Sequence, residues 1–133
     1  RKVAKKLQLD IAIIDKRRER ANQAEAMNVI GDVKKKKCII VDDIVDTGKT
    51  LIKGAEALRN EGASQVMAYI THGVLSNGGA QRMEDSEALS TLVITDTIPT
   101  RETNSVKVLS IAPMFAEAIR RINHNESISI LFE

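Results

Sequence analysis

The feature that most constrains the fold is the alternation of short apolar runs, each of strand length, with longer amphipathic stretches. The run at 38–41 is apolar at every position, which is typical of a parallel strand covered on both faces. The amphipathic stretches carry apolar residues near the helical period. We therefore predict an α/β fold, with a mostly parallel sheet flanked by helices on both faces.

Five strands and three helices are expected. The strands are predicted at 11–14, 38–41, 66–71, 91–95 and 106–111, and the helices at 50–60, 79–84 and 113–122. Gly62 is the expected C-terminal cap of the first helix, and Pro113 suits the first turn of the last. Residues 16–25 are charged without a clear period and indicate a long exposed loop, whereas 34–37 indicate a solvated turn.

Composition narrows the class of protein and of ligand. A chain of 133 residues suits one domain, and it has no apolar run of the roughly 20 residues that a membrane helix needs. The net charge is only +2, and one Tyr and two Phe offer little stacking surface for nucleic acid. Small phosphorylated ligands are the better expectation. The single cysteine, Cys38, lies in an apolar run and indicates a core residue in a reducing, cytoplasmic setting.

The start of the chain suggests a piece of a longer protein. It has no initiator Met, and the helical pattern of Val3, Ala4 and Leu7 begins without a capping residue. We expect residues 1–133 to be one domain of a larger protein.

Residues 39–51 are the most informative stretch for function. An apolar strand is expected to end at Asp42 and Asp43, and a loop with Asp46 and Gly48 leads into a helix. Ligands of open α/β sheets gather at the carboxyl ends of strands, and a helix N-terminus favours phosphate. A nucleotide P-loop is excluded, because its first glycine would stand at Asp43. Helix capping alone explains one of the three acids and Gly48. It does not explain the other two acids or the threonines Thr47 and Thr50.

The stretch 41–51 resembles the phosphoribosyl-pyrophosphate loop of type I phosphoribosyltransferases and of their relative, ribose-phosphate diphosphokinase. Three further segments are similar to the diphosphokinase: 13–18 resembles its catalytic loop, 27–33 the segment that follows, and 116–121 with 127–132 its C-terminus. The resemblance covers nearly the whole chain in the same order. It implies a type I phosphoribosyltransferase-like fold and the C-terminal half of a two-domain enzyme whose N-terminal half is absent.

The resemblance also implies the chemistry. The family transfers the diphosphoryl group of ATP to the 1-hydroxyl of ribose 5-phosphate, with Mg²⁺, giving phosphoribosyl pyrophosphate and AMP. By position, Lys16 and Arg18 would be catalytic, and Asp42 and Asp43 would hold the ribose hydroxyls and magnesium. The ribose 5-phosphate would be bound by Asp42, Asp43, Asp46, Thr47, Gly48, Lys49 and Thr50.

Regulation and assembly are implied in the same way. Phosphate or ADP would bind at a subunit interface lined by Ser127, Ser129 and Phe132, although these residues also suit a short edge strand. The full enzyme would be a homo-oligomer, with no membrane or nucleic-acid partner. The isolated chain would bind ribose 5-phosphate weakly and make no product.

Three departures leave alternatives open. Lys49 stands where the diphosphokinases usually have Gly, Glu19 where the catalytic loop usually has Pro, and Gly73 where Pro is usual. A phosphoribosyltransferase would share the loop at 41–51 but should lack the loop at 16–18 and the ending. A non-catalytic regulatory relative of the synthetase would keep the fold while its loops diverge.

Overall fold

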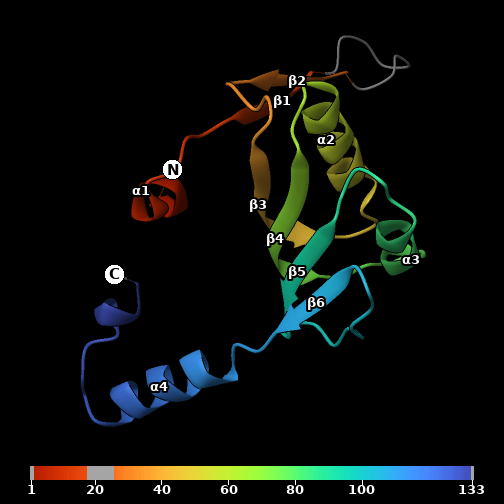
Figure 1. Ribbon diagram of the computed structural model, residues 1–133. Coiled ribbons are helices and arrows are strands. Elements are labelled where there is room, and N and C mark those ends of the chain that lie inside the picture. Colours follow the sequence, from red (N-terminus) through yellow and green to blue (C-terminus); the bar gives the residue numbers. More distant parts are fainter. Residues whose placement is uncertain (1, 18–25, 133) are drawn as a thin grey trace.

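A computed structural model describes residues 2–17 and 26–132, and it confirms the α/β fold (Figure 1). The elements follow the order α1 (Lys2–Leu7), β1 (Ile13–Arg17), β2 (Ala26–Ile30), β3 (Lys37–Val45), α2 (Lys49–Asn60), β4 (Gln65–Gly73), α3 (Gly79–Glu84), β5 (Thr91–Thr95), β6 (Val106–Leu109), α4 (Ala112–Asn123) and the 3-10 helix η1 (Ser129–Phe132). The predicted α3 and β5 have the observed bounds.

The central sheet has the order β3-β4-β5-β6, and each strand is parallel to its neighbours. Its register pairs Cys38 with Val66, Ala68 with Leu92, and Leu92 with Val106. Because the strands are parallel, all four carboxyl ends lie at one edge. The segments that follow β3 and β4 are therefore neighbours in space.

One face of this sheet forms the core. Ala68, Leu92 and Ile94 are fully buried there, and α2 adds Ala55 and Leu58. Gly54 lets α2 approach closely, since a Cβ at this position would lie 3.3 Å from Ile14 of β1. The full set of buried apolar residues is Val33, Val45, Ala55, Leu58, Ala63, Val66, Ala68, Ile70, Met83, Leu89, Leu92, Ile94 and Val106.

The opposite face differs from the prediction of helices on both faces. Ile39, Val41 and Tyr69 are 43%, 57% and 45% exposed on it. Neither α1 nor α4 has a buried residue, and Figure 1 shows both lying away from the sheet. Among the described residues, helices thus cover one face, the one beneath α2 and α3.

An antiparallel hairpin, β1 paired with β2, lies beside α2. The prediction of a loop over 16–25 is wrong at its start, because Lys16 and Arg17 belong to β1 and pair with Met27 and Ala26. Strand β2 was not predicted at all. The solvated turn is confirmed at 34–36, where Lys35 has a φ of +60° and Lys36 pairs with Asp10 and Asp32 at 3.1 and 3.2 Å.

Two further differences have local causes. Strand β6 ends at Leu109 rather than at 111, because the Asp96 carboxylate accepts the Ile111 N–H at 2.9 Å and the Ser110 hydroxyl at 2.6 Å. These two hydrogen bonds also lower the pKa of Asp96. Cys38 is half-buried against the core and burial raises the pKa of its thiol, as expected for a packing residue. None of the helices in the described part of the chain has the length and apolar character to cross a membrane.

Candidate functional site

The candidate site lies at the carboxyl edge of the sheet, where β3 leads through residues 46–50 into α2 (Figure 1). We call residues 46–50 the anion loop. Strand β3 runs past both acids to Val45, so the prediction that it ends at 41 is wrong. Its pairing continues through Ile44 with His72 and Val45 with Gly73, which holds Asp42 and Asp43 inside the strand.

The anion loop places backbone N–H groups at the start of a long helix. Gly48 has a φ of +77° and occupies the N-cap position of α2, a helix of 12 residues. A Cβ at this position would lie 2.1 Å from Met83 Cε, so only glycine fits without a shift. Gly48 brings no side-chain acceptor to the N–H groups of the first turn. These groups and the positive end of the helix dipole suit an anion.

The three acids of the site are exposed side chains. The Asp43 N–H donates to Asp42 Oδ1 at 2.9 Å, and Asp46 Oδ1 accepts the Ser76 hydroxyl. No group of three or more His, Cys, Asp or Glu with metal-binding geometry occurs in the part of the chain that the structure describes. Magnesium is usually held by one or two carboxylates together with substrate oxygens and water. Asp42 and Asp43 fit that kind of donor set.

The sequence analysis did not predict that a second part of the chain borders the anion loop. Residues 75–78, which we call the 75–78 turn, and α3 lie against the anion loop. The Arg82 guanidinium donates to the Thr47 carbonyl and, at 3.2 Å, to the Asn77 carbonyl. The parallel order predicted for β3 and β4 could have indicated this contact, because it makes the segments after these two strands neighbours.

His72 lies at the same edge, near the end of β4. Its Nδ1 is hydrogen-bonded to the Thr97 hydroxyl at 2.9 Å, and the Thr95 hydroxyl donates to the Thr71 carbonyl at 2.7 Å. Gly73 is explained by packing: a Cβ there would lie 2.4 Å from Ile94 Cδ1.

The remaining predicted residues lie apart from the anion loop or outside the described chain. The backbone of Lys16 lies in β1, opposite Met27, whereas Arg18 and Glu19 fall outside the described residues. Ser127, Ser129 and Phe132 are at the C-terminal end of the described chain. Ser129 and Phe132 bound the 3-10 helix η1, so the edge-strand alternative is wrong, and Phe132 is 78% exposed. Their regulatory role stays a prediction.

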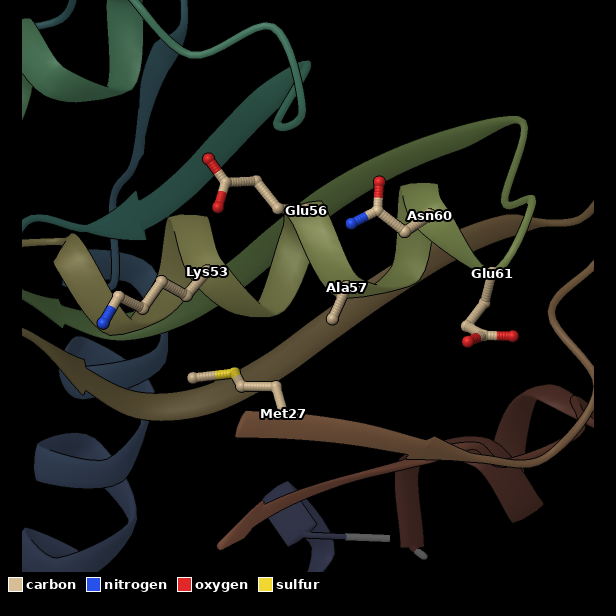
Figure 2. Close-up of a pocket in the computed structure, with 6 residues that line it drawn as sticks. All are labelled: Met27, Lys53, Glu56, Ala57, Asn60 and Glu61. Atoms are coloured by element: carbon tan, nitrogen blue, oxygen red, sulfur yellow. The ribbon is translucent and has the colours of Figure 1, made fainter. Parts of the chain in front are cut away.

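An open pocket of about 400 Å³ lies elsewhere, between β2 and α2 (Figure 2). Figure 2 shows Met27 facing α2, with Lys53, Glu56 and Asn60 projecting from that helix. None of the predicted site residues lines this pocket. Its mixture of one lysine with Glu56 and Glu61 gives no preference for an anion, so the chemistry favours the sheet edge as the candidate site.

Comparisons with protein families, with known sequences and with solved structures all find proteins of the same kind. The family model described as phosphoribosyl synthetase-associated domain matches residues 16–133. A ribose-phosphate pyrophosphokinase of Campylobacter jejuni is 57% identical over 99% of this chain, and one of Pasteurella multocida is 54% identical over 92%. The crystal structure of phosphoribosylpyrophosphate synthetase from Mycobacterium smegmatis matches 93% of this chain with a TM-score of 0.81 and 38% identity.

The chain spans less than half of the length of each of these proteins. It covers 43% of the Campylobacter relative, 40% of the Pasteurella relative and 40% of the Mycobacterium chain.

Proposed function

The chain belongs to the ribose-phosphate pyrophosphokinase family, and we propose that it supplies the ribose 5-phosphate site of an enzyme that makes phosphoribosyl pyrophosphate. The observation that carries the proposal is the anion loop, which joins a strand end bearing two acids to the uncapped N-terminus of α2. This arrangement offers an anion site beside groups that can accept hydrogen bonds from sugar hydroxyls.

Each group of the loop has a role in this proposal. The N–H groups of Gly48, Lys49 and Thr50 bind the 5-phosphate at the positive end of the α2 dipole. The hydroxyls of Thr47 and Thr50 donate to its oxygens. The exposed ammonium group of Lys49 adds charge to the same site, so its presence in place of Gly strengthens phosphate binding.

The carboxylates of Asp42 and Asp43 accept hydrogen bonds from the ribose hydroxyls and orient the sugar. Magnesium, when bound by these carboxylates with substrate oxygens, supplies positive charge that offsets the charge of the phosphates. The 1-hydroxyl of the sugar then attacks the β-phosphorus of ATP, and AMP leaves. Lys16 and Arg18 are proposed to neutralise the transferred diphosphoryl group, because such transfer depends mainly on positioning and cationic stabilisation.

Several finer predictions belong to the whole enzyme. The covered fractions show how much of each relative the chain matches, but not which part of it. The C-terminal placement of this chain therefore stays a prediction. Reading the gene on both sides of this segment decides it: a long coding stretch upstream supports the placement, and one downstream contradicts it. The cytoplasmic location, the homo-oligomer, regulation by phosphate or ADP, and the inactivity of the chain alone also stay predictions.

The test is calorimetric titration of ribose 5-phosphate into the chain in the presence of magnesium. Saturable binding is expected, and Thr50→Val should weaken it by about tenfold, because valine keeps the branched shape and removes one hydroxyl donor. Thr91→Val is the matched control, since Thr91 begins β5 at the opposite edge of the sheet. Equal binding by the Thr50→Val and Thr91→Val variants would contradict the placement of the site.

A further inference from the structure

Arg82 contacts the anion loop through the backbone of the loop rather than through a side chain. It lies on α3, half-buried, and its guanidinium donates to the carbonyl of Thr47. Its other terminal nitrogen donates to the carbonyl of Asn77 in the 75–78 turn, at 3.2 Å. One side chain therefore joins the loop after β3 to the turn after β4.

The Thr47 carbonyl shares a peptide unit with the Gly48 N–H. The chain has no cis peptide bond among its described residues. In a planar trans peptide the C=O and N–H vectors are antiparallel. A Thr47 carbonyl held toward Arg82 therefore turns the Gly48 N–H to the opposite side, away from α3.

Little else in the loop holds this peptide unit in place. Glycine adopts positive and negative φ about equally readily, so rotation of the unit meets little steric resistance at Gly48. The Gly48 carbonyl, which accepts the Ile52 N–H at 3.0 Å, belongs to the next peptide unit. A charged donor on the Thr47 carbonyl is thus the contact that selects one orientation.

Helix α3, which carries Arg82, is held in place by contacts on both sides. Met83 is fully buried beside Gly48, and Glu84 accepts the Ser105 N–H at 3.0 Å. A hydrogen bond from the Thr103 hydroxyl and the one from the Ser105 N–H lower the pKa of Glu84. At the other side, the Ser76 hydroxyl donates to Asp46 Oδ1. Arg82 therefore acts from a rigid position.

We propose that Arg82 is a positioning residue for the sugar-phosphate site: by holding the Thr47 carbonyl it presents the Gly48 N–H to the bound phosphate. This inference rests on the proposed function for its ligand. Arg82 itself touches no substrate in this arrangement. Its contribution is a preset direction of one hydrogen-bond donor, which a phosphate would otherwise have to select on binding.

The experiment compares Arg82→Met with Arg59→Met. Arg59 donates to the carbonyls of Ala63 (2.7 Å) and Ser64 at the far end of α2, so it is also an arginine that bonds two main-chain carbonyls. By calorimetry with ribose 5-phosphate, Arg82→Met should lose about tenfold in affinity, and Arg59→Met should bind like the parent. Arg82→Lys keeps one charged donor and should fall between the parent and Arg82→Met.

A second measurement needs no ligand. Residual dipolar couplings report the direction of each backbone N–H, and the coupling of Gly48 should change in Arg82→Met while those of Ile52 to Leu58 stay the same. An unchanged Gly48 coupling, or an equal loss of affinity in Arg59→Met, would overturn the proposal. Absence of binding by the parent chain would count against the proposed function, and the Gly48 coupling would then decide the role of Arg82.

Discussion

Helices α2 and α4 have the same length of 12 residues and similar amphipathic patterns, yet they meet different surroundings. Helix α2 buries Gly54, Ala55 and Leu58 against the central sheet and the β1–β2 hairpin. Helix α4 buries no residue, and its stripe residues Phe115, Ile119 and Ile122 are 53%, 65% and 62% exposed. An apolar stripe therefore predicts a helix, but it does not predict which surface the helix covers.

The two helices are also stabilised by different interactions. Packing of an apolar face supplies most of the stability of a helix such as α2. The described contacts of α4 are instead ion pairs: Arg120 lies 2.9 Å from Glu117 and 3.0 Å from Glu126, and Arg121 lies 2.7 Å from Glu117. Exposed pairs of this kind contribute little to stability and are screened by salt.

The largest expected difference comes from matched truncations on the two stripes. Leu58→Ala on α2 should lower the free energy of unfolding by about 2–5 kcal/mol, because Leu58 is 3% exposed and a cavity remains. Ile119→Ala on α4 should change it by about 0.5 kcal/mol or less. Urea unfolding followed by circular dichroism measures both. Equal losses would mean that α4 is packed in solution.

The next effect in size is a difference in stability between alanine substitutions at Gly48 and Gly78, the N-cap residues of α2 and α3. Gly48 and Gly78 have φ values of +77° and +76°, so alanine at either position meets the same left-handed strain of about 1–2 kcal/mol. A Cβ at Gly78 has nothing within 4 Å, whereas one at Gly48 meets Met83. Because a buried methionine must then repack, Gly48→Ala should cost about 1 kcal/mol more than Gly78→Ala. Thermal unfolding of the two variants checks this difference, and equal losses would show that Met83 yields freely.

The smallest effect is a pH dependence that arises from Glu117 of α4. Hydrogen bonds from Arg120 and Arg121 lower the pKa of Glu117 from 4.5 to about 2. The contribution of this carboxylate to folding is therefore present above pH 4.5 and is lost as the pH falls through about 2. The side-chain carboxyl chemical shift of Glu117 should titrate near the lower end of this window, and the amide shifts that follow the same titration should stop moving in Glu117→Gln. A transition centred near the ordinary glutamate pKa would contradict the ion-pair geometry.

The sequence predicted those elements whose signals are local. Helix α3 and strand β5 have the predicted bounds because turn residues flank them on both sides. Strand β2 was missed, since Met27 and Val29 alternate with polar or exposed positions over only a few residues, and its partner lies across the segment at 18–25. The extension of β3 to Val45 depends on pairing with β4, which local patterns do not contain.

The site was predictable in part for the same reason. The anion loop is contiguous, so Asp46 and Gly48 stand out beside the strand that precedes them. Ser76 and Arg82 reach the loop only because two parallel strands bring distant segments together. The regulatory role of Ser127 and the catalytic role of Lys16 came from resemblance alone, and both stay predictions.

The strand order of the central sheet has a consequence for the growing chain on the ribosome. Because β3, β4, β5 and β6 are neighbours in the order of synthesis, each strand can add to an edge that has already emerged. No strand must wait for a later one to be inserted beside it. The contacts of the anion loop and of α3 are complete once β6 has paired, because Ser105, which bonds Glu84, directly precedes β6. This part of the protein can therefore take shape before α4 is made.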